Sequence, residues 1–140
     1  MIKRVLILED DLETLSTIFK TLRKFEVEIG EDKNFIEIAT TVFSEYTKIE
    51  KWLNKAKKNE FEVILMDRDC ILGGSFHCLD FGIYNPTKVI GISSMPPYNE
   101  ELKQIGVKAL ITKDYRNLDE FSSLLEKELR KLLIEEEASN

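Results

Sequence analysis

The 140-residue sequence predicts a protein of the α/β class, in which helices cover a parallel β-sheet. Short apolar segments rich in Val, Ile and Leu recur along the chain, as expected for strands that are buried on both faces. Between them lie longer segments whose apolar residues recur every three or four positions, the pattern of an amphipathic helix. Alternation of the two patterns indicates βα units and therefore a parallel sheet.

The first half of the chain carries the clearest examples of both patterns. In chain order, we expect a strand at 2–8, a helix at 12–25, a polar stretch at 26–33, an edge strand at 35–39, a helix at 43–56 and a strand at 61–66. The edge strand is predicted from alternating polar and apolar residues, whereas the first and third strands are nearly continuous apolar runs.

The second half begins with the segment 70–86, which contains paired glycines and Asn85-Pro86 and therefore holds at most a short helix. After it we expect a strand at 88–92, a short helix at 98–105 opened by Pro96-Pro97, a strand at 107–112 and a helix at 118–132. Asn117 and Glu120 have the spacing of a capping box for that last helix. The acidic end, from about residue 135, is expected to fray.

Five strands without a repeat, linker or low-complexity tract predict a single domain over residues 1–140. The natural arrangement is a flavodoxin-like (βα)5 sandwich of three layers, with a parallel sheet of strand order 2-1-3-4-5. Right-handed crossovers then bring the carboxyl ends of all strands to one edge of the sheet. In this class of fold, ligands bind at that edge, where the strand order reverses.

The composition limits the classes of function. The formal net charge of −6 and a pI of about 5.0 argue against nucleic acid as a partner. No apolar run reaches the roughly 18 residues that cross a bilayer, and the N-terminus lacks the core of a secretory signal, so we expect no membrane partner. Two cysteines are no disulfide framework, which favours a cytoplasmic location.

Polar side chains follow four of the predicted strands. Glu9 and Asp10 come after the first strand, Asp67 after the third, Ser93 at the fourth and Lys113 after the fifth. Because these strand ends share one edge, we expect the side chains to lie together. Clustered carboxylates raise each other's pKa unless a cation neutralises them, and their hard oxygens suit Mg²⁺. A carboxylate can attack phosphorus, and a nearby Lys and Ser would stabilise the transferred phosphoryl group.

Four segments in this order resemble bacterial response-regulator receiver domains, and the resemblance covers nearly the whole chain. They are Leu6-Ile-Leu-Glu-Asp-Asp11, Glu62-Val-Ile-Leu-Met-Asp67, Val89-Ile-Gly-Ile-Ser-Ser94 and Ala109-Leu-Ile-Thr-Lys113. The resemblance implies a phosphoacceptor signalling switch of a two-component phosphorelay rather than an enzyme. The phosphoryl donor would be a phosphohistidine of a sensor histidine kinase or histidine phosphotransfer protein. The chain would act as a stand-alone receiver through contacts with an unknown output protein.

The resemblance also implies roles for matching positions. Asp67 would be the phosphoacceptor, Asp10 would bind Mg²⁺ directly and Glu9 would act mainly through metal-bound water. The backbone carbonyl of Asp69 would complete the protein's share of the coordination. Ser93 would hydrogen-bond the phosphoryl group.

The last role falls to Lys113, which would pair with the phosphate. Three departures from the family pattern accompany these residues. Cys70-Ile71 replaces the usual Met-Pro, and Leu110 replaces the aromatic switch residue. Asp114 replaces a proline that follows the lysine in a cis peptide bond; we expect a trans bond here, and Asp114 could pair with Lys113. The departures predict a modified output mechanism.

Several alternatives remain open at this stage. The first is a degenerate receiver that acts as a phosphorylation-independent interaction module. The second is a phosphatase of the haloacid dehalogenase type, because Asp67-Arg-Asp69 follows a strand, although that motif normally lies near the N-terminus. Asp10 or Asp11 could also simply cap the next helix.

Two further clusters have simpler interpretations. Cys70, His77, Cys78 and Asp80 could hold zinc, but their spacing lacks a Cys-x-x-Cys element, so local packing is favoured. The lysine-rich stretch 48–58 is interpreted as the solvated face of a helix.

Overall fold

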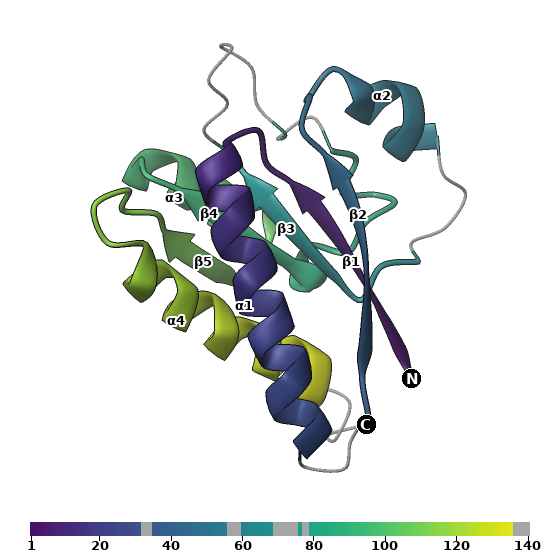
Figure 1. Ribbon diagram of the computed structural model, residues 1–140. Helices are drawn as coiled ribbons and strands as arrows, with labels where there is room; N and C mark the ends of the chain where they lie inside the picture. The colour runs from purple at the N-terminus through teal and green to yellow at the C-terminus, as the bar shows by residue number, and fades with distance from the viewer. Residues whose placement is uncertain (32–34, 56–59, 69–75, 77–78, 136–140) are drawn as a thin grey trace.

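The structure is a computed structural model that describes residues 1–31, 35–55, 60–68, 76 and 79–135. Its centre is a parallel sheet of five strands in the order β2-β1-β3-β4-β5, which confirms the predicted topology (Figure 1). The strands are β1 Ile2–Leu8, β2 Glu37–Phe43, β3 Val63–Asp67, β4 Val89–Ser93 and β5 Ala109–Thr112.

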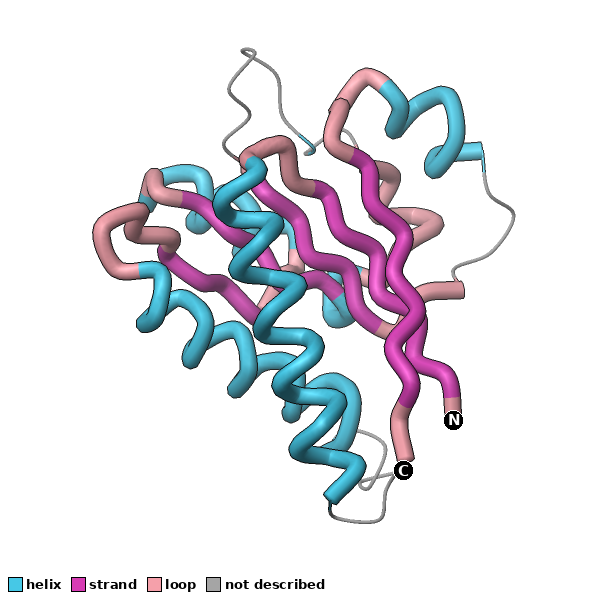
Figure 2. Tube along the Cα trace, in the orientation of Figure 1, coloured by secondary structure: helices cyan, strands magenta, loops and turns pink. Residues whose placement is uncertain are grey.

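Helices lie on both faces of the sheet, as the three-layer prediction requires (Figures 1 and 2). They are α1 Leu12–Glu31, α2 Lys48–Trp52, α3 Pro96–Ile105 and α4 Leu118–Arg130, with short helical turns at Leu53–Lys55, Pro86–Lys88 and Lys131–Glu135. α1 and α4 cover one face, whereas α2 and α3 lie on the other. No helix within the described ranges is long and apolar enough to cross a membrane.

Alternation along the strands divides the core into two clusters. Val5 and Ile7 of β1 pack beneath α1 and α4, whereas Leu6 and Leu8 pack on the opposite face. All four side chains are fully buried, because β1 is a central strand with a neighbour on each side. Burial on both faces accounts for the continuous apolar character of this strand.

The first helix is longer than predicted. The polar stretch from residue 26 was expected to be a connection, but α1 continues to Glu31. Ile29 lies four positions after Phe25 and is buried on the same face of the helix, so the apolar stripe extends one further turn. Glu26 is held by two contacts: its carboxylate accepts hydrogen bonds from Arg23 at 2.6 Å and from the backbone N–H of Ile38 at 2.8 Å.

The second strand and helix also differ from the prediction. β2 occupies 37–43 rather than 35–39, and α2 begins at Lys48 rather than at Phe43. The physical reason is backbone pairing, because β2 is in register with β1 from Glu37 opposite Ile2 to Phe43 opposite Leu8. Phe43 therefore belongs to the strand.

The end of the chain agrees closely with the prediction. The Asn117 side chain accepts a hydrogen bond from the backbone N–H of Glu120 at 3.2 Å, which confirms the predicted cap of α4. The turn Lys131–Glu135 extends that helix beyond the predicted end at residue 132. The acidic residues after 135 and most of the segment 70–78 lie outside the described residues.

Gly91 allows close packing at the centre of β4. A Cβ atom at this position would lie 2.7 Å from Leu102 Cδ1 and 2.9 Å from Leu110 Cδ2. We therefore expect Gly91→Ala to lower the free energy of unfolding by about 1–3 kcal/mol, measured by urea denaturation. The control is Gly30→Ala in α1, where no atom would lie within 4 Å. That change should raise stability by about 0.5–1 kcal/mol, and equal effects of the two substitutions would contradict the packing argument.

Candidate metal and phosphoryl site

The sheet brings the predicted polar residues to its carboxyl edge. Glu9 and Asp10 directly follow β1, and Asp67 is the last residue of the adjacent strand β3. Carboxylate oxygens of these three residues all lie within 4.8 Å of one another. Ser93 ends β4 and Lys113 follows β5, so all the strands except the edge strand β2 contribute to this place.

Lys113 joins two of the carboxylates. Its Nζ lies 3.4 Å from Asp67 Oδ1 and 3.5 Å from Glu9 Oε2. The three side chains are at most 1% exposed, so these ion pairs are shielded from solvent. The backbone N–H of Lys113 donates to the carbonyl of Ser93 at 2.9 Å, which fixes the start of the β5–α4 loop. The backbone of Lys113 is therefore held by β4, while its ammonium is held by the two carboxyl groups.

Burial and neighbouring charges shift the pKa values of Glu9 and Lys113. Burial, followed by the charge of Asp67, raises the pKa of Glu9 to about 8, although Lys113 opposes this shift. Burial disfavours the ammonium of Lys113, but the charges of Glu9 and Asp67 outweigh it and raise the pKa of this lysine. Lys113 thus stays protonated, while Glu9 binds a proton more tightly than a solvated carboxyl does.

The donor set fits a hard divalent cation. Three carboxylates meet beside one ammonium, and each offers an oxygen of the kind that Mg²⁺ prefers. A cation would replace the proton that burial and the charge of Asp67 otherwise favour on Glu9. Asp69, whose carbonyl was expected to join the coordination, lies outside the described residues.

Asp11 has a structural role next to this cluster. Its Oδ2 accepts a hydrogen bond from the backbone N–H of Thr14 at 2.9 Å, and its own N–H donates to Glu9 Oε1 at 3.0 Å. The capping alternative is therefore correct for Asp11, which caps α1. The backbone N–H of the same residue orients the Glu9 carboxyl, so the start of α1 also positions one acid of the cluster.

Ser93 is fully buried and hydrogen-bonded to its own loop. Its Oγ accepts from the backbone N–H of Met95 at 2.9 Å and lies 3.2 Å from the Met95 carbonyl. Leu110, at the position expected for an aromatic switch residue, is partly buried and packs with the cluster beneath α3. Hydrogen bonds between Ser93 and Met95 therefore hold the loop after β4. Position 110 contributes no aromatic ring to this region, because it is a leucine.

Asp114 does not pair with Lys113, contrary to the expectation. Its carboxylate accepts from the backbone N–H of Arg116 at 2.9 Å and from Arg116 Nε at 3.3 Å, because the turn places these donors closer. The hydrogen bonds from Arg116 lower the pKa of Asp114. No cis peptide bond occurs in the described part of the chain, as expected for Asp114.

Two residues near the site were not identified from the sequence. Lys113 Nζ lies 4.9 Å from the ring centroid of Tyr115, which is 45% exposed. Arg68 stacks on Tyr98 at 4.5 Å and pairs with Glu101 of α3 at 2.9 Å. In the sequence, these residues are marked only by their nearness to predicted site residues: Arg68 directly follows Asp67, and Tyr115 lies two positions after Lys113. Tyr115 lies over the ammonium, and Arg68 ties the end of β3 to α3.

The other sequence clusters add no site among the residues that can be described. Cys70, His77 and Cys78 of the zinc alternative lie outside them, and Asp80 hydrogen-bonds within its own turn, from the N–H of Gly82. The carboxylates at the sheet edge are the metal-compatible group found in the described ranges. Trp52 in the lysine-rich stretch is 58% exposed, in agreement with a solvated helix face.

At the level of sequence, no protein-family model matches this chain and no curated protein matches it. Solved structures do match. The Mn²⁺-bound form of response regulator Rcp1 is 13% identical, with 95% of each chain covered and a TM-score of 0.70. The phosphorylated cyanobacterial phytochrome response regulator RcpA is 15% identical, with 96% of each chain covered and a TM-score of 0.65.

A third structure is the receiver domain of sensor histidine kinase PA1611 from Pseudomonas aeruginosa, with a magnesium ion coordinated in its active-site cleft. It is 14% identical and has a TM-score of 0.60, with 94% of this chain and 98% of that chain covered. The chain therefore has the flavodoxin-like fold of response-regulator receiver domains over nearly its whole length. That fold carries the acidic cluster of Glu9, Asp10 and Asp67 at its carboxyl edge.

The raised pKa of Glu9 predicts how pH affects the metal-free protein. The folded state retains this proton to about pH 8, whereas an unfolded chain releases it near 4.5. The stability of the wild type relative to Glu9→Gln should therefore fall as pH rises from about 4.5 to about 8, and then stay level. Melting temperatures in EDTA at several pH values test this, with exposed Glu100→Gln as the control. A wild type that gains stability relative to Glu9→Gln across this window would contradict the argument.

Proposed function

We propose that this chain is a receiver of a two-component phosphorelay, which takes a phosphoryl group from a phosphohistidine onto Asp67. The observation that carries the proposal is the buried Lys113 bridging Asp67 and Glu9, with a carboxylate oxygen of Asp10 within 4.8 Å of oxygens of both acids. A structural ion pair needs one carboxylate, whereas here two carboxyl groups contact one ammonium and a third lies beside them. Such a cluster suits Mg²⁺ and a phosphoryl group together.

In the proposed reaction, a carboxylate oxygen of Asp67 forms a bond to phosphorus while the bond from phosphorus to the histidine nitrogen breaks. The electron pair returns to the imidazole, which leaves as a neutral or protonated ring. Mg²⁺, bound by Asp10 and Asp67 and through water by Glu9, would supply positive charge to the phosphoryl oxygens. Lys113 would shift from its carboxylate partners to one of these oxygens. Ser93 would exchange its contact with Met95 for the phosphoryl group.

The partners follow from this chemistry. The donor is a sensor histidine kinase or a histidine phosphotransfer protein, and the product is a signalling state rather than a released compound. The chain would work in the cytoplasm as a stand-alone receiver, by contact with an output protein. Tyr98 and Glu101 of α3 contact Arg68, next to Asp67, so α3 is the element through which a change at the acceptor would reach the surface.

Phosphorylation of Asp67 can be tested with small donors. In the presence of Mg²⁺, acetyl phosphate should add one phosphoryl group to the wild type, and beryllofluoride should shift resonances around Glu9, Asp67 and Lys113. Asp67→Asn should lose the modification completely, because the amide is not a nucleophile. Intact mass and chemical-shift mapping are the measurements, and exposed Asp119→Asn is the control. If the wild type and Asp67→Asn behave identically, the proposal fails.

A second candidate is a degenerate receiver that binds its partner without phosphorylation. Leu110 and the Arg116-bound Asp114 favour it, because both alter positions near the proposed switch. In that case the chain would bind neither Mg²⁺ nor beryllofluoride, although it stays folded. The phosphatase alternative would instead give multiple turnover on a small phosphate ester, which Asp69→Asn would abolish.

Tyr115 should control how long the acyl phosphate survives. Its ring lies beside Lys113, in a position to limit the approach of water to a phosphoryl group on Asp67. We expect Tyr115→Ala to shorten the lifetime of phosphorylated Asp67 roughly tenfold, which corresponds to about 1.4 kcal/mol of barrier. Tyr115→Phe should keep most of the lifetime because the ring remains. The decay of the phosphorylated mass measures this, with exposed Asp119→Asn as the control; equal decay in Tyr115→Ala and wild type would refute the role.

A further inference from the structure

The edge strand β2 is exposed to an unusual degree for a strand of a folded sheet. Residues 39–42 are all exposed, so side chains on both faces of β2 reach solvent. On one face the described part of α2 is only five residues long. Charged residues and prolines commonly protect an edge strand from pairing with another chain. The segment from Ile38 to Phe43 contains neither.

The outward-facing backbone groups of β2 can be assigned from the bonds to β1. Glu37 donates to the Met1 carbonyl, and the Phe43 carbonyl accepts from Glu9, so the odd-numbered residues pair with β1. The N–H and C=O groups of residues 38, 40 and 42 therefore point away from the sheet. Glu26 of α1 already binds the N–H of Ile38. The carboxylate thus closes one end of the edge and leaves Thr40 and Val42 to another partner.

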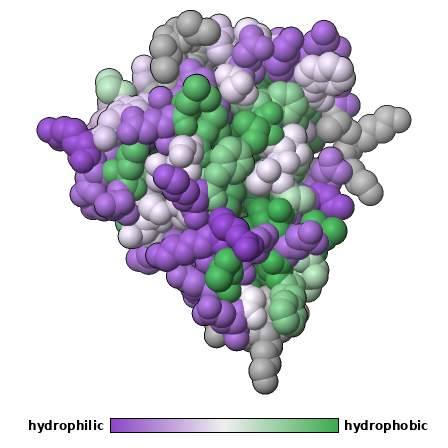
Figure 3. All heavy atoms as spheres, in the orientation of Figure 1, coloured by the Kyte–Doolittle hydropathy of each residue, from purple (hydrophilic) through white to green (hydrophobic). Residues whose placement is uncertain are grey.

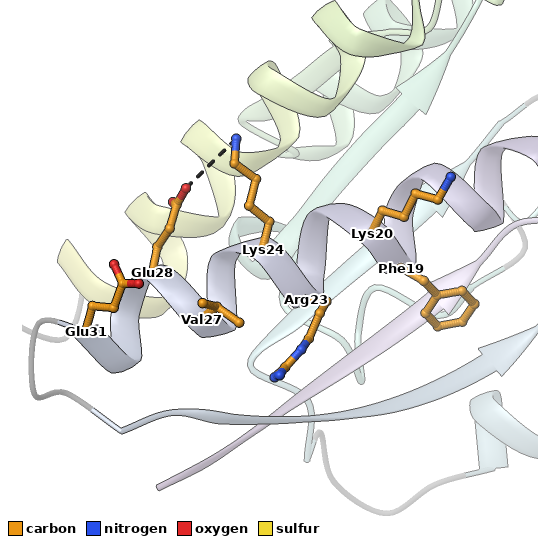
Figure 4. Close-up of a pocket in the computed structure, with 7 residues that line it drawn as sticks. All are labelled: Phe19, Lys20, Arg23, Lys24, Val27, Glu28 and Glu31. Carbon is orange, nitrogen blue, oxygen red and sulfur yellow. Dashed lines mark ion pairs between the residues drawn. The ribbon is translucent and has the colours of Figure 1, made fainter.

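A shallow hollow of about 760 Å³ lies along α1, on the side of the sheet that this helix covers. All seven residues that line it belong to α1; two are apolar, Phe19 and Val27, and the other five are charged: Lys20, Arg23, Lys24, Glu28 and Glu31 (Figure 4). Phe19 and Val27 are 41% and 43% exposed, and Val42 of the strand is 39% exposed. The space-filling view shows apolar side chains on this face interspersed with hydrophilic ones (Figure 3). Phe19 and Val27 are therefore exposed apolar side chains on the helix that covers this side of the sheet.

We propose that β2 pairs antiparallel with β2 of a second copy of this chain, about a two-fold axis at Thr41. In this register Thr40 lies opposite Val42 of the second copy, and each N–H meets a carbonyl across the axis. All the outward groups of Thr40 and Val42 are then used, while Ile38 keeps its bond to Glu26. The two Thr41 side chains face each other as a close, non-hydrogen-bonded pair.

A second copy is favoured over another partner because the strand is complementary to itself. Within the paired segment Ala39 lies opposite Phe43 and Thr40 opposite Val42, so no like charges meet. A two-fold axis perpendicular to the sheet also keeps both α1 helices on the same side. Phe19 and Val27 of each copy then border a common groove above the paired strands. One strand pair buries little area, so we expect a dissociation constant of about 10–100 µM.

A charge exchange at Thr41 tests the axis. Sedimentation equilibrium between about 10 µM and 1 mM should show a monomer–dimer equilibrium for the wild type. Thr41→Lys and Thr41→Glu should each be monomeric, because like charges lie directly opposite, and an equal mixture should regain the dimer. Ser123→Lys on the exposed face of α4 is the control and should dimerise as the wild type does. Circular dichroism checks that every variant is folded.

The register has its own test. In a Cys70→Ser, Cys78→Ser background, Thr41→Cys should form an intermolecular disulfide readily, whereas Thr40→Cys should form little. A wild type that is monomeric throughout, a dimer unaffected by Thr41→Lys, or preferred cross-linking at position 40 would each overturn the proposal. The dimer does not depend on the proposed phosphorylation, so Asp67→Asn should associate as tightly as the wild type.

Discussion

The burial of the Lys113 ammonium between Asp67 and Glu9 is the interaction on which the rest of the structure depends. A charge without solvent contact must be paired, and here the partners come from strands β1 and β3 while the lysine follows β5. The pairing is possible only if strand ends that are far apart in sequence meet at one edge. Parallel order β1-β3-β4-β5 satisfies this, because the carboxyl end of every strand lies on the same side. The strand order therefore determines which charged side chains can meet at the site.

The same cluster links electrostatics to the proposed signal. Burial and the charge of Asp67 raise the pKa of Glu9, so without a metal this side chain binds a proton more readily than a solvated carboxyl does. A cation and a phosphoryl group would redistribute these charges and release Lys113 from its present partners. Two neighbouring contacts can report such a change. Arg68 joins the end of β3 to α3, and Ser93 holds the loop through Met95. Coupling through these contacts would not require an aromatic side chain at Leu110.

The two ends of the sheet are organised differently. At the site, side chains that follow or end four strands converge; Glu9, Asp67, Ser93 and Lys113 are buried, whereas Asp10 is half-buried and Tyr115 is 45% exposed. At the edge, β2 is held by β1 and by the carboxylate of Glu26, while Thr40 and Val42 face outward. A short α2 and a long α1 produce this asymmetry. The structure consequently separates a largely buried, charged site from a neutral, exposed edge.

The amino-acid sequence by itself determined the elements whose signal is local. Continuous apolar runs predicted β1 and β3, the spacing of Asn117 and Glu120 predicted the cap of α4, and strand ends predicted where Asp67 and Lys113 lie. The chemical roles of those residues remain predictions. Ile29 continues the apolar stripe of α1, but the polar residues around it were interpreted as a connection. Periodicity could not predict the placement of Phe43 in β2, because pairing with the distant strand β1 decides it.

Only the tertiary structure decided which charged groups pair. Asp114 was expected to reach Lys113, yet Arg116 is closer in the folded loop, and Lys113 instead binds carboxylates 46 and 104 positions away. Tyr115 acquires its position over the ammonium in the same way. Sequence reports the order of residues along each strand and helix. The distances between side chains of different strands arise only when the sheet assembles, and those distances determine the chemistry of the site.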